Sequence, residues 1–261
     1  MFETVRELTR YRGMIGNFIR KEIRGKYKGS LLGFLWNFIV PITQVAVYLM
    51  VFSIVFRPGI ESYPIYLVVG MVPWIFLSES LISGSGSIVN NSNMVTKIYF
   101  PRSILPISTV VSKFVNFVIS IGIEVVIILA TGYGLDPVML LLLPLVTLLF
   151  FMAITGVTLI LAAINTYFRD VEYIVNVLMM VLVWLSPIMY MRSMSSEGSL
   201  MSIILNLNPV TYYIEAFQAI FYYQALPELF TMVFCVVFAV AILAFGFYVF
   251  NKLEKDFAEV L

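Results

Sequence analysis

Three ionisable residues, Glu79, Lys113 and Glu124, fall inside otherwise apolar stretches of this sequence. Charged side chains at membrane depth are costly, and they usually mark a path for an ion, a proton or a substrate. We expect Lys113 to reach the membrane interface along its aliphatic stem. For Glu124 two roles stay open, because it could line a pore or hydrogen-bond between helices. Glu79 and Glu124 should lie at different depths, so they do not predict a catalytic pair.

The other chemical signals argue against an enzyme. The chain has no histidine, which removes the commonest general base and metal ligand. The phosphate-binding pattern GxxxxGK[ST] does not occur, so the chain itself should not hydrolyse ATP. A single cysteine, Cys235, permits no disulfide framework and no thiol metal cluster. The net charge of +1 indicates no acidic partner, and hence no nucleic acid.

Two short segments combine charges with aromatic residues between apolar runs. KIYFPRS begins at Lys97, directly after a stretch rich in Gly, Ser and Asn, and NTYFRDVE occupies residues 165–172. Such segments are more elaborate than a connection between two spans requires, which favours a docking surface. Ordinary anchoring at lipid headgroups is the alternative for each segment.

Aromatic residues are frequent in the apolar runs, at 15% of the chain. Most of them should form an interfacial belt or fill the core. Aromatic faces with polar groups also suit a sliding sugar chain, because they can stack on pyranose rings and hydrogen-bond to hydroxyls.

The elements that position these residues are membrane helices. Of the 261 residues, 61% are hydrophobic and 12% are charged, which is a membrane composition. Apolar runs near or above the roughly 20 residues that cross a bilayer predict an all-α integral membrane protein with six transmembrane helices. The runs are 31–56, 62–78, 103–135, 137–168, 173–191 and 229–251.

The distribution of basic residues predicts the orientation of these spans. Eight Lys and Arg residues precede the first span, which places the N-terminus in the cytoplasm. With six spans, the C-terminus and the connections near 84–102 and 165–172 are cytoplasmic as well. The connections near 57–62, 132–137 and 191–228 are then external, and Asp136-Pro137 and Asn208-Pro209 mark helix starts there.

Two further elements are expected outside the spans. Apolar residues recur at helical spacing within residues 1–28, which predicts a cytoplasmic amphipathic interface helix ahead of a transmembrane domain at 29–261. No cleavable signal peptide is expected. The last external segment holds two apolar pieces that are too short to span, and we expect them to form re-entrant helices near 198–222.

Four stretches of the sequence resemble one family. YKGSLLGFLWNFIVP at 27–41, NSNMVTKIYFPRSILPIS at 91–108, NTYFRDVEYIV at 165–175 and NLNPVTYYIEAFQ at 206–218 look like the permease subunits of ABC-2 type polysaccharide exporters. This group includes the O-antigen, capsule and teichoic acid exporters. The likeness extends over essentially the whole chain.

The resemblance implies a homodimer in the bacterial inner membrane that exports a lipid-linked polysaccharide, most closely O-antigen. ATP and Mg²⁺ would bind to a separate ATP-binding cassette subunit. Short coupling elements near 88–102 and 165–172 would contact that subunit. They would include Asn93, Lys97, Tyr99, Pro101, Arg102, Arg169 and Asp170.

The resemblance also indicates a region for the channel and its external gate. Our candidates there are the aromatic residues Trp36, Tyr48, Trp184, Tyr190, Tyr212 and Tyr213. A teichoic acid or capsular polysaccharide exporter is the nearest alternative function. From other classes we weigh an ion-coupled secondary carrier, which would need Glu124 in a relay, and an intramembrane transferase, which the missing histidine disfavours.

Overall fold

The computed structural model describes residues 11–25, 33–51, 59–98, 100–196 and 198–261. Every regular element within these ranges is helical, in agreement with the all-α prediction. The helices of four residues or more are α2 (Arg12–Gly25), α3 (Trp36–Val51), α4 (Tyr63–Ser85), α5 (Ser92–Val95), α6 (Ile104–Ala130), α7 (Pro137–Leu140), α8 (Leu143–Tyr167), α9 (Val171–Leu182), α10 (Leu200–Leu207), α11 (Pro209–Gln218), the π-helical turn η5 (Ala219–Tyr223), α12 (Leu229–Leu253) and α13 (Phe257–Val260).

Several helices are suited to a bilayer. Among the described residues, four stretches are long and apolar enough to cross a membrane: Tyr63–Ser85, Ile104–Ala130, Pro137–Tyr167 and Leu229–Asp256. Two shorter apolar helices, Ile42–Val51 and Val171–Leu182, lie within the runs that the sequence predicted as the first and fifth spans. The chain is therefore a multi-pass membrane protein by length and composition.

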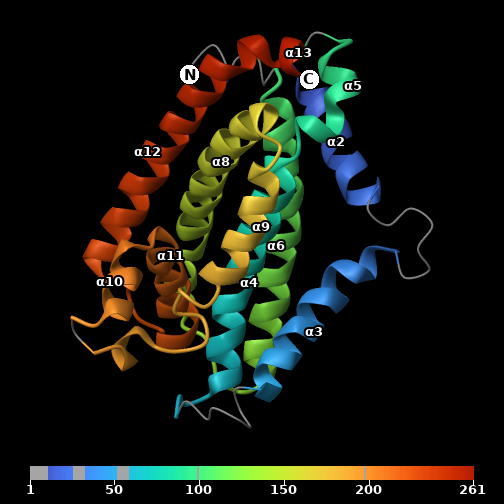
Figure 1. Cartoon of the computed structure of the whole chain (residues 1–261). Helices are drawn as coiled ribbons and strands as arrows, with labels where there is room; N and C mark the ends of the chain where they lie inside the picture. The colour runs from blue at the N-terminus through green and yellow to red at the C-terminus, as the bar shows by residue number, and fades with distance from the viewer. Residues whose placement is uncertain (1–10, 26–32, 52–58, 99, 197) are drawn as a thin grey trace.

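Helix α4 contacts α3, α6, α8, α9 and α11. Helix α12 runs along α8, and α3 lies to one side of the bundle, where it packs on α4 (Figure 1). The helices α2, α5 and α13 gather at one end of the bundle, which we call the α13 end. Helices α10 and α11 lie at the opposite end, the α11 end (Figure 1).

Helix α12 approaches α8 closely because two glycines face each other. A Cβ on Gly156 would lie 2.5 Å from the carbonyl oxygen of Ile242, and one on Gly246 would lie 2.4 Å from that of Gly156. Small residues at such positions let the backbones of membrane helices come together, and van der Waals packing then holds them.

Local sequence signals set the helix starts as expected. Asp136 caps α7 by accepting from the Val138 N–H at 2.8 Å, and Pro137 occupies the first turn, where it needs no hydrogen bond. Asn208 caps α11 in the same way through the Val210 N–H at 3.0 Å, again followed by a proline. The two short helices expected between residues 198 and 222 are present as α10 and α11.

Candidate functional site

The connection from α4 to α6, residues 86–103, lies at the α13 end and carries most of the predicted coupling residues. Asn93 and Lys97 are exposed, whereas Pro101 and Arg102 are partly buried. Tyr99 lies outside the described residues. Ile98, next to Lys97, leaves 54% of its surface exposed although it is apolar.

The second half of KIYFPRS is held inside the protein. Phe100 is 4% exposed and packs among the apolar side chains of the α13 end, with its ring centroid 6.4 Å from that of Phe18 in α2. The Arg102 guanidinium donates to the carbonyl oxygen of Glu254 and lies 5.9 Å from the centroid of the Phe257 ring. Phe100 and Arg102 therefore fix the connection to α2 and to the C-terminal tail, while Lys97 and Ile98 point outward.

The second predicted coupling element, NTYFRDVE, is built around a buried asparagine. Asn165 is 1% exposed, and its side-chain oxygen accepts from the Glu172 N–H at 3.0 Å in the first turn of α9. Asp170 occupies the position before α9, but its side chain makes no capping hydrogen bond. The cap therefore comes from the end of α8, which leaves the Asp170 carboxylate exposed.

The second coupling element, like the first, exposes apolar and basic side chains on its surface. Phe168 is 68% exposed and Tyr173 is 73% exposed, and Arg169 lies between them on the surface. The two connections also touch, because a Cβ on Gly86 would lie 2.7 Å from Glu172 Oε2. The structure thus brings both predicted coupling elements together at one end.

At the α11 end the predicted fifth span is not a continuous helix. Helix α9 ends at Leu182, and residues 183–191, which we call the unwound segment, contain Pro187. Proline removes one N–H donor and clashes with the preceding turn, so it ends a helix. The unwinding exposes carbonyl groups that need donors, since unpaired backbone groups are expensive away from water.

Side chains from other elements supply these donors. Tyr63 donates to the carbonyl oxygen of Met189 at 3.2 Å, and Gln218 donates to that of Pro187 at 2.8 Å. Tyr66 reaches the carbonyl oxygens of Pro187 at 3.2 Å and Tyr190 at 2.9 Å. These residues come from α4 and α11, so the unwound segment is tied to both helices.

Asn208 completes this set of contacts. Its side-chain amide donates to the Leu185 carbonyl and to Ser186 Oγ, at 3.0 Å each. Because Asn208 also caps α11, the start of that helix is coupled directly to the unwound segment.

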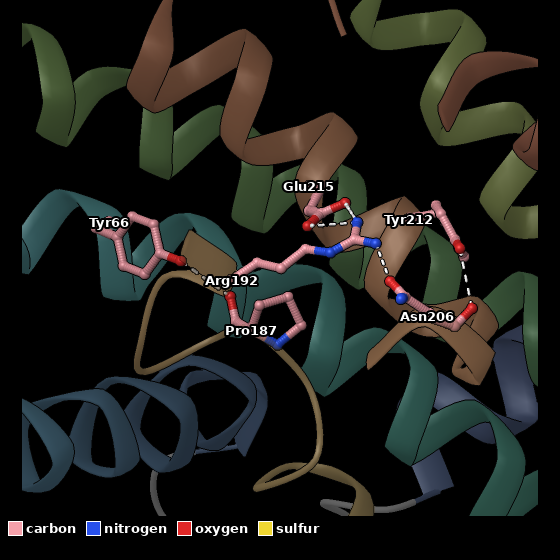
Figure 2. A network of polar contacts seen from close by, with 6 residues as sticks. All are labelled: Tyr66, Pro187, Arg192, Asn206, Tyr212 and Glu215. Atoms are coloured by element: carbon pink, nitrogen blue, oxygen red, sulfur yellow. Dashed lines mark hydrogen bonds and ion pairs between the residues drawn. The ribbon is translucent and has the colours of Figure 1, made fainter. Parts of the chain in front are cut away.

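Arg192 joins the next stretch of chain to α10 and α11. Its guanidinium donates to both oxygens of Glu215, at 3.2 and 3.0 Å, and to the side-chain oxygen of Asn206 (Figure 2). It also lies 5.7 Å from the centroid of the Tyr212 ring, and the Tyr212 hydroxyl donates to the Asn206 carbonyl at 2.9 Å. Burial raises the pKa of the Glu215 carboxyl, and the adjacent Arg192 opposes that rise.

A polar pocket of about 950 Å³ lies beside this network. Its lining includes Tyr66, Arg192, Asn206, Glu215 and Gln218, and it extends to Tyr223 and to the start of α12. Hydroxyl, amide and charged groups next to aromatic rings form a surface that can hydrogen-bond and stack with a hydroxyl-rich molecule.

The predicted channel aromatics fall into two groups. Trp36 and Trp184 are 38% and 52% exposed, and Trp184 meets Tyr48 edge to face at 6.4 Å, so α3 and the unwound segment touch. Tyr212 and Tyr213 are 5% and 1% exposed, and the Tyr213 hydroxyl donates to the Cys235 carbonyl at 2.8 Å. Tyr190 is partly buried and donates to the Trp184 carbonyl. The gate role of these residues stays a prediction.

The charged residues at membrane depth are separate from both ends. Lys113 pairs with Glu79 at 3.0 Å, so its ammonium is neutralised within the bundle. Glu124 is 2% exposed on α6. Tyr66, Gln218, Arg192 and Glu215 were not among the residues predicted for the α11 end, although Pro187 inside an apolar run was a local signal that the helix breaks there.

Known proteins resemble this chain over most of its length. A family described as "ABC-2 type transporter" matches residues 15–222. The O-antigen export system permease protein RfbA of Myxococcus xanthus is 35% identical over 260 residues, which cover 99% of each chain. Two proteins of the same name from Klebsiella pneumoniae are each 29% identical and cover 92% of each chain.

Proposed function

Since the chain belongs to the ABC-2 type transporter family, we propose that it is the transmembrane subunit of an ABC exporter for lipid-linked O-antigen polysaccharide. The observation that carries this proposal is the 35% identity to an O-antigen export permease over 99% of both chains. ATP and Mg²⁺ belong to a separate ATP-binding subunit.

In this proposal the protein has six spans in the bacterial inner membrane, with both termini in the cytoplasm. Helix α3 and the stretch from α9 through the unwound segment supply the first and fifth spans, beside the four longer ones. The channel forms between two copies of the chain. In support of this arrangement, Tyr48 of α3 meets Trp184 of the unwound segment, so two predicted channel aromatics lie together, and Trp184 is 52% exposed.

The ATP-binding subunit docks at the α13 end. The exposed side chains of Lys97, Ile98, Phe168, Arg169 and Tyr173 support this docking, because apolar anchors flanked by positive charges suit a protein interface. The adjacency of the two connections lets one partner contact both.

The α11 end acts as the external gate, with α10 and α11 as re-entrant helices. Discontinuous membrane helices form substrate sites in many transporters. The unwound segment and the polar pocket beside it support this role, because they offer hydroxyl, amide and aromatic groups to a passing glycan.

The test is to express this chain with the ATP-binding subunit encoded beside its gene in a strain that lacks its own O-antigen permease. We expect restored O-antigen at the cell surface, and a purified complex that hydrolyses ATP in lipid. Surface display without the ATP-binding subunit would contradict an ATP-driven exporter and would favour an ion-coupled carrier. A stable complex that restores capsule or teichoic acid export but no O-antigen would correct the substrate alone.

A further inference from the structure

A groove of about 250 Å³ runs between α3, α4 and α6, away from both ends described above. Its surface is mostly apolar, but Lys113, Asn116, Ser120 and Glu124 recur at intervals of three or four residues along one face of α6 and place a row of polar groups in it. This polar face extends about 16 Å along the helix. The facing walls are apolar and include Val45 and Leu49 of α3 and Val72 of α4.

Two acceptors in this groove are buried without a donor. Glu124 is 2% exposed, and neither its Oε1 atom nor Oδ1 of Asn116 has a hydrogen-bond partner among the described residues. The cation that lines the groove, Lys113, donates to Glu79 at 3.0 Å. A buried acceptor without a donor is unfavourable, so the groove suits a ligand that donates hydrogen bonds.

The composition of the groove restricts that ligand further. Glu79 and Glu124 both line it and Lys113 is paired with Glu79, so an anionic head group would meet carboxyl side chains without an unpaired ammonium among the described lining residues. A cationic amine would have to lose its hydration in an apolar surrounding. A neutral hydroxyl on an aliphatic chain avoids both penalties, because the chain fills the apolar walls while the hydroxyl meets an acceptor.

The rim of the groove indicates where the ligand comes from. Ile42, Ile123 and Ile127 line the groove and are 59%, 37% and 46% exposed. Ile123 and Ile127 lie on α6, which is long and apolar enough to span a membrane, so their exposed side chains suit contact with lipid and the groove opens onto that surface.

We propose that this groove binds an uncharged membrane lipid, whose hydroxyl group donates to Glu124 and whose aliphatic chain lies between α3 and α4. The site lies within one chain and is independent of the exporter function proposed above. Glu124 then binds a ligand and does not take part in a proton relay.

The probe is dodecanol carrying a photoreactive diazirine in the middle of its chain, added to the purified full-length protein in lipid nanodiscs. After irradiation, mass spectrometry of peptides maps the labelled residues. We expect labels in 42–49, 68–76 and 116–127. Unlabelled dodecanol should compete about tenfold better than dodecane or dodecanoate, which corresponds to one hydrogen bond. Even labelling over all lipid-facing helices, or equal competition by dodecane, would overturn the proposal.

Variants of one side chain refine the test. Glu124→Leu removes the acceptor and should reduce labelling about tenfold, whereas Glu124→Gln keeps a carbonyl acceptor and should retain it. Ser108→Ala is the matched control, because Ser108 Oγ is also buried on α6 without a partner but does not line the groove. Undiminished labelling of Glu124→Leu would contradict the proposal. If Glu124→Leu does not fold, the competition between dodecanol and dodecane in the unaltered protein still tests the proposal.

Discussion

Lys97 and Arg102 stand in one short connection, yet they occupy opposite environments. Lys97 is exposed beside Ile98, whereas the Arg102 guanidinium donates to the Glu254 carbonyl and covers the Phe257 ring. Phe257 itself is fully buried. At the scale of the residue, one conspicuous motif therefore divides into a part that holds the fold and a part available for a partner.

Arg102→Ala should loosen the C-terminal tail. It removes a hydrogen bond and a cation–π contact, together about 1–2 kcal/mol. Limited proteolysis with trypsin should then cut faster at Lys255. The control is Lys97→Ala, which removes an exposed charge from the same connection and should leave tail cleavage unchanged. Equal cleavage of both variants would refute the anchoring role of Arg102.

Tyr66→Phe should destabilise the α11 end. The Tyr190 carbonyl would lose the hydroxyl that donates to it at 2.9 Å, whereas the Pro187 carbonyl would keep Gln218. Leaving one buried carbonyl unpaired costs about 1–3 kcal/mol. Thermal unfolding in detergent measures the loss, with Tyr248→Phe as a matched change at a residue that is 62% exposed. A Tyr66→Phe protein as stable as the control would show that the unwound segment does not depend on this bond.

At the scale of elements, α8 and α12 approach each other closely, and the cause is the absence of side chains at Gly156 and Gly246. The neighbouring atoms are backbone atoms, which cannot rotate away as a flexible side chain would. Helix α9 shows the opposite case, since Pro187 interrupts the helical run and donors from α4 and α11 restore the lost pairing.

Gly156→Ala should separate α8 from α12. A Cβ there would lie 2.5 Å from the Ile242 carbonyl oxygen, so the helices must shift, at a cost of about 1–3 kcal/mol or more. Gly122→Ala is the control, because no atom of another element lies within 4 Å of its added Cβ. In a helix interior that change should be neutral or stabilising by about 0.5–1 kcal/mol. If the unfolding temperatures of both variants fell by the same amount, the packing argument would be contradicted.

At the scale of the molecule, the two ends of the bundle differ in character. The α13 end exposes positive charges and apolar side chains on two adjacent connections, while the α11 end carries a polar pocket and an unwound segment. Helices α4 and α8 join the ends, since α8 contacts both α13 and α11, and α4 contacts α11 and leads into the 86–103 connection. A displacement at the docking face can therefore reach the proposed gate through packed helices.

Reversing the charges of Lys97 and Arg169 to Glu should weaken association with the ATP-binding subunit while the protein still inserts. Electrostatic complementarity at an interface governs association and partner choice, and like charges across it are repulsive. We expect about a tenfold loss in the amount of co-purified ATP-binding subunit per chain. Glu228→Lys, a charge reversal at an exposed residue of the opposite end, should leave it unchanged. Normal association of the Lys97 and Arg169 variant would place the docking surface elsewhere.

The sequence by itself determined the features that depend on neighbouring residues. Hydropathy predicted membrane helices, Asp136 and Asn208 predicted helix starts, and short apolar pieces predicted the two helices α10 and α11. These features are local because hydrogen bonding within a helix and capping involve residues a few positions apart.

Only the tertiary structure decided which distant groups meet. Arg102 binds a carbonyl 152 positions away, and Tyr66 binds one 121 positions away. The sequence could not distinguish Arg102 from Lys97, because both are basic residues in one exposed-looking connection. Their roles differ because the packing of α2, α6 and the C-terminal tail buries one side of that connection, and local patterns do not encode which side.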